Sequence, residues 1–176
     1  MPNRLPFLNA QGGQPLTRYL DTNGDGTGTK NATGDYSGGA NFFIQPPAGE
    51  VYTLHRMIIS ISDASLRADH YGGLGSALSN GIAVTLQNST GMLSLVDGLP
   101  IKLNSDWNHL AHDRQRDAYG SATVENLSIR WSFDKFGGAL VLNGDRADKL
   151  IVEFSDDLTG LVNHLFMVQG QRVQTR

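Results

Sequence analysis

Short segments in which apolar and polar residues alternate recur along the chain, and they predict β-strands. The clearest is Leu127–Phe133, where each large apolar residue is followed by a polar one. Successive side chains of a strand point to opposite faces, so one face of this segment is apolar and the other polar. We expect Ile129, Trp131 and Phe133 in the core and the polar residues between them on the opposite face, as in a half-buried antiparallel strand.

Further strands are predicted on both sides of this segment. Ile82–Gln87 and Met92–Val96 flank a turn and predict a hairpin. Val51–Ser62 contains a continuous apolar run, which indicates a central strand covered on both faces. Towards the C-terminus we expect strands at Ala139–Asn143, Lys149–Ser155 and Leu161–Gln169.

These segments predict an all-β protein with roughly eight or nine strands. They are closely spaced, and no helix of crossover length separates them, which favours an antiparallel β-sandwich or barrel over a parallel α/β sheet. We expect a jelly-roll-like sandwich. Tyr71–Ser79 and Trp107–Ala118 are the two segments that could form short helices between strands.

The first forty residues lack sustained periodicity and are rich in Gly, Asn, Thr and Asp. Such a composition is typical of a long loop or surface arm. The expected organisation is therefore an extended N-terminal arm over residues 1–40 and a single sandwich domain over residues 41–176. The apolar residues that would anchor the arm during assembly are Leu5, Phe7, Leu8, Leu16, Tyr19 and Leu20.

Composition narrows the class of protein. The chain has 176 residues, of which 39% are hydrophobic and 18% charged, so it is too apolar for a disordered protein. The net charge of -3 gives no excess positive field, and we expect no nucleic-acid partner. The absence of cysteine excludes disulfides, thiolate zinc sites and a cysteine nucleophile. We also expect no signal peptide and no membrane span, because no apolar block is long enough for either.

One segment resembles half of a calcium-binding loop. Asp21, Asn23 and Asp25 place oxygen-bearing side chains at alternate positions, and Gly26 permits a sharp turn. The position at which a full loop has a bidentate Glu is Ala32. Calcium is therefore the one candidate cofactor, and a set of Asx turns is the alternative interpretation of the same residues.

No residue pattern predicts catalysis, and we expect the protein not to be an enzyme. His109 and His112, which Asp113 follows, could share a metal from one helical turn, but the sequence does not identify the third ligand that such a site needs. Adjacent acids such as Asp156 and Asp157 usually shape a turn.

Two histidines and one tryptophan are expected to have a structural or a binding role. His55 and His164 fall in predicted strands, where a hydrogen-bonded structural role is expected. Trp107 is the one plausible exposed aromatic residue and a possible ligand contact for a sugar.

Five short signatures follow one another along the chain: GTGTKNA at 26–32, PPAGEVY at 46–52, LSNGI at 78–82, RWSF at 130–133 and DDLTGL at 156–161. From about Gly26 to Gly170, their order resembles that of small structural proteins of tailed bacteriophages. The resemblance implies a virion component, made in the host cytoplasm and assembled with other virion proteins such as a major capsid, neck or tail protein. It names no catalytic or binding residue.

The expected function is that of a virion structural protein and, within the particle, of a capsid decoration (cement) protein that stabilises the head through subunit contacts. An acidic sandwich with a polar arm suits packing among copies of itself and neighbouring subunits, so we expect a homo-oligomer. The alternatives are a tail or head-to-tail connector component, and a carbohydrate- or receptor-binding module that uses Trp107 and the loop acids.

Overall fold

The computed structural model describes residues 13–22, 24–26, 40–63, 74, 76, 78–80, 82–89, 91–96, 112–118, 125–133, 138–159 and 163–175. These residues form the strands β1 (Gln14–Tyr19), β2 (Ala40–Ile44), β3 (Glu50–Asp63), β4 (Ile82–Asn88), β5 (Gly91–Val96), β6 (His112–Ala118), β7 (Glu125–Ser132), β8 (Leu140–Asn143), β9 (Lys149–Phe154) and β10 (Asn163–Gln174), and the short 3-10 turn η3 (Gly144–Arg146). In this described part of the chain, no helix is long and apolar enough to cross a membrane.

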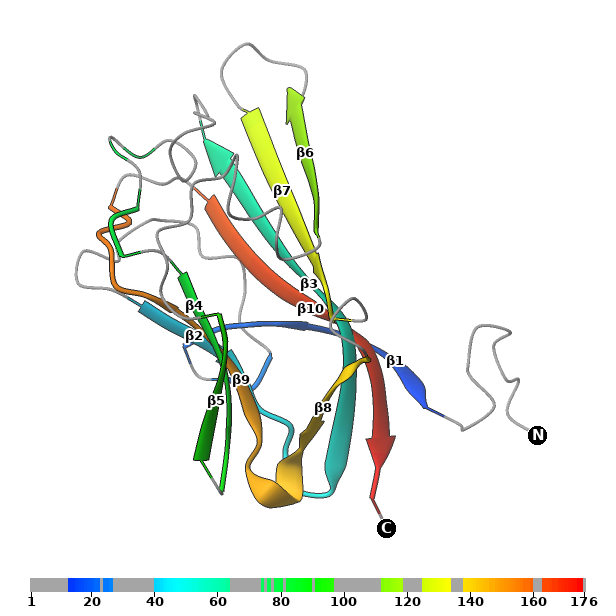
Figure 1. The fold of residues 1–176 in the computed structure, drawn as a ribbon. Helices are drawn as coiled ribbons and strands as arrows, with labels where there is room; N and C mark the ends of the chain where they lie inside the picture. Colours follow the sequence, from blue (N-terminus) through cyan, green and yellow to red (C-terminus); the bar gives the residue numbers. More distant parts are fainter. Residues whose placement is uncertain are drawn as a thin grey trace.

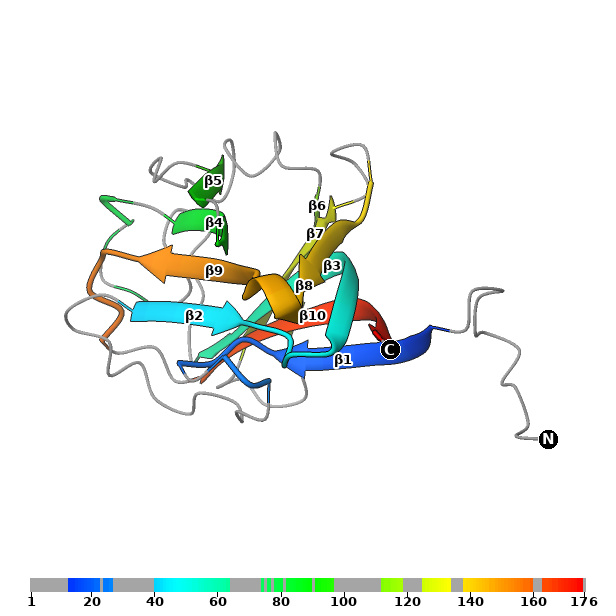
Figure 2. The same cartoon turned by 90° about the horizontal axis from the view of Figure 1, so that it is seen from below.

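The strands form two antiparallel sheets, as the sequence predicts. The larger sheet has the order β1-β10-β3-β7-β6, with β8 also paired to β3, and the smaller has the order β2-β9-β4-β5. The two sheets form the two layers seen in Figure 1 and, from below, in Figure 2. The all-β sandwich is thus confirmed, while the jelly-roll path stays a prediction.

The core lies between the two sheets and is rich in aromatic rings. Phe42 of β2 stacks on Phe166 of β10 across the sandwich, with 4.5 Å between ring centroids, and Phe154 of β9 packs against both. Trp131 and Phe133 are buried, and their rings lie 5.9 Å apart. The predicted core role of these two residues is confirmed, and Arg130 between them is exposed, as the alternation requires.

The long strand β3 is central in its sheet. It pairs with β10 along one edge and with β7 and then β8 along the other. The register of β3 with β10 skips His55 opposite Gln169 and Gly170, so the buried positions shift from Leu54 to Met57 and stay on one face. The prediction that β3 is covered on both faces is wrong in part, because described residues of its second face, such as Ile58, are only half-buried.

The predicted boundary of the N-terminal arm needs correction. Gln14–Tyr19 is strand β1, which pairs with β10 at the edge of the larger sheet. Leu16 and Leu20 are buried in the core, so they are not assembly contacts of a detached arm. After β1 the chain crosses to the smaller sheet, where Asp21 pairs with Phe43 of β2. This segment therefore belongs to the sandwich and joins the edges of its two sheets.

The hairpin of β4 and β5 is confirmed, with Asn88 opposite Gly91 at its turn. The helix predicted within Trp107–Ala118 is wrong for its second half, because His112–Ala118 is strand β6 and pairs with β7. An edge strand can be polar at every position, and charged residues there prevent further pairing, so β6 shows no alternation in its sequence. The predicted helix at Tyr71–Ser79 lies largely outside the described residues, and those described there are not helical.

A tight corner connects β8 of the larger sheet to β9 of the smaller one. Gly144 is required there, because a Cβ atom at this position would lie 1.9 Å from the carbonyl oxygen of Pro47. The Asp145 carboxylate accepts a hydrogen bond from the Gly49 backbone N–H (2.8 Å) and one from the Thr175 hydroxyl (3.3 Å). The corner thereby fixes the turn before β3 and the end of β10.

Candidate functional site: a polar pocket at the mouth of the sandwich

The inward face of the larger sheet changes from apolar to polar towards one end. On β10, Phe166 and Val168 are buried in the core, and Arg172 lies further along the same face. The register places Arg172 beside Tyr52 of β3 on one side and beside Gln14 of β1 on the other. The strands therefore carry polar side chains into the space between the sheets at this end.

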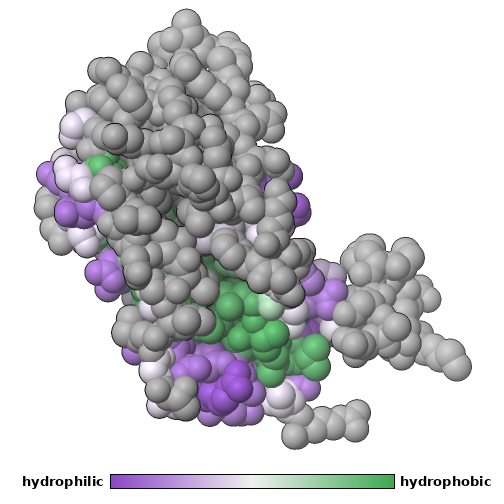
Figure 3. Space-filling view, in the orientation of Figure 1, coloured by the Kyte–Doolittle hydropathy of each residue, from purple (hydrophilic) through white to green (hydrophobic). Residues whose placement is uncertain are grey.

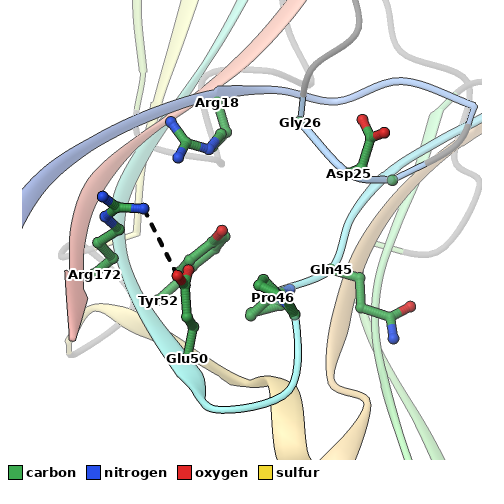
Figure 4. A pocket seen from close by; sticks show the side chains of 10 residues that line it. Arg18, Asp25, Gly26, Gln45, Pro46, Glu50, Tyr52 and Arg172 are labelled. Atoms are coloured by element: carbon green, nitrogen blue, oxygen red, sulfur yellow. Dashed lines mark ion pairs between the residues drawn. The ribbon is translucent and has the colours of Figure 1, made fainter. Parts of the chain in front are cut away.

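These side chains line a hollow of about 600 Å³, which we call the mouth pocket. Its wall consists of Arg18, Gly24, Asp25, Gly26, Gln45, Pro46, Pro47, Glu50, Tyr52 and Arg172. Figure 4 shows the two arginine side chains entering from β1 and β10, with the segment at 24–26 and the chain after β2 on the other side. The volume lies within the range of about 300–1,000 Å³ that is usual for small-molecule sites.

Arg172 is held by two neighbours. One of its guanidinium nitrogens lies 3.7 Å from a carboxylate oxygen of Glu50, the ion pair drawn in Figure 4. Its Nε and Nη2 groups donate to the side-chain oxygen of Gln14 at 3.2 and 3.0 Å. The Arg172 and Glu50 side chains are 34% and 15% exposed, so the pair lies at the boundary between core and solvent. Arg172 is thus fixed in orientation by contacts on both sides.

Arg18 of β1 also lies near Tyr52. The Tyr52 hydroxyl is within hydrogen-bonding reach of the Glu50 and Arg18 side chains. Burial is the main cause that raises the pKa of the Tyr52 phenol, and the nearby Glu50 carboxylate adds to this effect, while Arg18 opposes it. The phenol therefore stays protonated over a wide pH range and joins the carboxylate and the guanidinium in one network.

Gly26 makes room for the Arg18 side chain. Its φ angle of 72° is in the left-handed region, and a Cβ atom there would lie 2.7 Å from Cδ of Arg18 and 2.8 Å from Cδ1 of Ile44. The glycine lets the backbone cover the aliphatic part of Arg18, which leaves the guanidinium at the pocket. Arg18 takes part in neither the Arg172–Glu50 nor the Arg146–Asp148 ion pair.

The outer face of the same sheet carries a small apolar area. Val141 of β8 and Val173 of β10 are 47% and 43% exposed. Val51 of β3 is directly opposite Val173 in the register and diagonal to Val141, so the three residues form a contiguous valine patch across three strands. Figure 3 shows apolar surface over β8 and the adjoining end of β3, next to hydrophilic residues.

The predicted calcium ligands are only partly placed. The buried Asp21 carboxylate accepts a hydrogen bond from the backbone N–H of Gly24, three residues further on, a local contact that shapes this bend. Asp25 is exposed and lines the mouth pocket, and Asn23 lies outside the described residues. Among the residues that are described, no three His, Asp or Glu side chains gather as a metal site would require.

Asp156 and Asp157 shape a loop, as predicted. Asp156 accepts from the backbone N–H groups of Ser79 and Asn80 at 2.8 and 2.9 Å, and Asp157 accepts from that of Thr159 at 2.9 Å. The hydrogen bonds from Thr159 lower the pKa of the Asp157 carboxyl. Both acids border a second hollow of about 310 Å³, but their carboxylate oxygens accept hydrogen bonds from backbone N–H groups.

The remaining candidates are scattered. His55 and His164 lie in β3 and β10, as expected. His112 and Asp113 lie in strand β6 and not in a helical turn. Trp107, His109 and the predicted arm residues Leu5, Phe7 and Leu8 lie outside the described residues.

Sequence reasoning missed the mouth pocket. Its side chains lie in or beside segments whose alternation breaks down, because Arg18 and Arg172 occupy inward positions that would ordinarily be apolar. A usable signal was present in β10: the period of two that includes Phe166 and Val168 leads through Gly170 to Arg172. No family model, curated protein or solved structure matches this chain.

Proposed function

We propose that the chain is a structural subunit of a tailed-bacteriophage particle and, within it, a capsid decoration protein that stabilises the head through contacts between subunits. The resemblance of the five sequence signatures supports the phage assignment. The valine patch supports the role as a subunit, and it is the observation that carries the proposal. It places apolar side chains on the outward face of a rigid sheet, where they are costly to leave in water.

In this role, the valine patch is the surface that contacts a neighbouring virion protein. The valine patch is small, and its residues lie on three strands that are hydrogen-bonded to one another. A partner can therefore bind it without rearrangement of the sheet. Polar residues of the η3 turn, such as Asp145 and Arg146, are exposed close to it in the chain. An apolar centre with a polar surround is the usual anatomy of a specific protein interface.

The test compares particles that carry the wild-type chain with particles that carry Val141→Asp, which places a charge in the patch. We expect the amount of the protein per particle to fall by about tenfold or more, since burying an unpaired charge at an interface costs several kcal/mol and each 1.4 kcal/mol is about a factor of ten in affinity. The matched control is Glu153→Arg, a charge change at an exposed position of β9 in the other sheet. It should leave incorporation unchanged.

Density maps of the same particles separate the positions within the virion. Copies at many icosahedrally related sites on the head support decoration, whereas copies only at the neck or tail support the connector alternative. Absence of the protein from purified particles, or normal incorporation of Val141→Asp, would contradict the proposal.

A further inference from the structure

The mouth pocket is lined by charged side chains at inward positions of the larger sheet. Charged side chains at core-facing positions of a sandwich lose hydration, and this cost is recovered only where they find partners. Arg172 has such partners in Glu50 and Gln14. The described partners of Arg18 are the Thr17 backbone carbonyl, which accepts from Nη1 at 3.0 Å, and the Tyr52 hydroxyl. A guanidinium has five N–H donors in a planar fork that matches a carboxylate. The Arg18 guanidinium can therefore also donate hydrogen bonds to the carboxylate of a ligand.

The other residues of the mouth pocket restrict what this ligand can be. The positive charges of Arg18 and Arg172 are offset by the negative charges of Glu50 and Asp25, all of which line the hollow. A polyphosphate or a nucleic-acid backbone would be repelled by these two carboxylates. A ligand with a single carboxylate and several hydroxyl groups would fit, because its hydroxyls can donate to the two acids.

The pocket also has apolar and neutral surface. Pro46 and Pro47 contribute their rings, and Gln45 also borders the hollow. Figure 4 shows Pro46 across the hollow from Arg172, with Tyr52 and Glu50 between them, and the Gln45 side chain directed away from the hollow. A ligand that lies in the hollow would contact apolar rings on one side and hydrogen-bonding groups on the other, an arrangement suited to the mixed surface of a pyranose.

We propose that the mouth pocket binds a carboxylate-bearing sugar, with Arg18 holding the carboxylate and with Glu50 and Asp25 accepting hydrogen bonds from the hydroxyl groups. Arg172 and Tyr52 act as positioning residues, because they fix the Glu50 carboxylate. This site is separate from the valine patch, which lies on the opposite face of the same sheet. The binding can therefore be tested on the isolated chain, without particles, and independently of the proposed structural role.

The experiment titrates the full-length chain with D-glucuronate and follows backbone amide chemical shifts. D-glucose and acetate, at the same concentrations, supply the sugar without the charge and the charge without the sugar. We expect saturable shifts of amides around the mouth pocket with glucuronate, and much weaker binding of the other two compounds. Equal binding of acetate would reduce the site to a simple anion site, and equal binding of glucose would remove the role of Arg18; either result overturns the proposal.

The variant Arg18→Gln should weaken glucuronate binding by about tenfold or more, because it removes a charge-assisted contact. Arg18→Lys keeps the charge but loses the planar fork, so it should retain part of the affinity. The matched control is Arg130→Gln, at an exposed position of β7 whose side chain is directed away from the core, and it should bind as the wild type does.

Thermal unfolding of each variant shows whether it is folded. If Arg18→Gln does not fold, Arg18→Lys and the comparison of the three compounds on the wild-type chain decide the question. Unchanged affinity in a folded Arg18→Gln variant overturns the proposal, as does the absence of any saturable shift with glucuronate.

Discussion

The inward face of the larger sheet has two ends built on the same strands, and they differ in kind. At one end Phe166 and Val168 of β10 are buried against the smaller sheet. At the other end Arg172 of the same strand reaches a hollow lined by polar groups. The alternation of β10 continues from one end to the other, across the irregularity in its pairing with β3 at Gln169 and Gly170. A strand's period fixes which side chains share a face, but the chemistry of those side chains decides whether that face becomes core or a binding site.

The apolar end should dominate stability. Phe166→Ala removes a ring that stacks on Phe42 and packs against Phe154, and the residue is only 1% exposed. We expect the free energy of unfolding to fall by about 3–5 kcal/mol, since the loss of burial and the cavity left behind add together. Chemical denaturation of the isolated chain measures this value.

The comparison variant is Arg172→Ala at the polar end of the same strand. Its side chain is 34% exposed and its ion pair is partly solvated, so the loss should be far smaller than for Phe166→Ala. Equal losses at the two positions would show that the polar end is a second structural core, contrary to the assignment of a binding site.

A smaller effect is expected from Gly26→Ala, which tests how the polar end is built. The left-handed backbone costs a non-glycine residue about 1–2 kcal/mol, and the new Cβ would also displace the Arg18 side chain. The matched control is Gly49→Ala, where φ is 82° and a Cβ would meet nothing within 4 Å. Both variants should lose stability in thermal unfolding, but only Gly26→Ala should also weaken glucuronate binding.

The same contrast explains how far the sequence predicts this molecule. Trp131 and Phe133 were placed in the core from alternation alone, and the β4–β5 hairpin from a turn between two alternating segments. Strand β1 and the last residues of β10 were missed, because their inward positions include Arg18 and Arg172. The arginines that line the candidate site thus interrupt the apolar alternation from which their strands could be predicted. Only the long-range strand pairing of the fold brings these side chains together.

The smallest expected effect comes from Tyr52→Phe, which removes one hydroxyl at the boundary between the two ends. The loss near neutral pH should be about 0.5–1.5 kcal/mol, the usual net value of a hydrogen bond. Because the folded state raises the pKa of the phenol, Tyr52 ionises first in the unfolded chain. Its stabilising contribution is therefore complete below the unfolded pKa of about 10 and declines as the pH rises through that value towards the folded one.

The stability difference between wild type and Tyr52→Phe should consequently shrink above pH of about 10. The other tyrosines are present in both proteins, so their ionisation cancels in the difference. Unfolding curves recorded from neutral to alkaline pH provide the measurement. A difference that stays constant or grows with pH would mean that burial and the Glu50 carboxylate do not hold Tyr52 in its protonated form. The Tyr52 phenol would then be solvated and would not belong to the network at the mouth pocket.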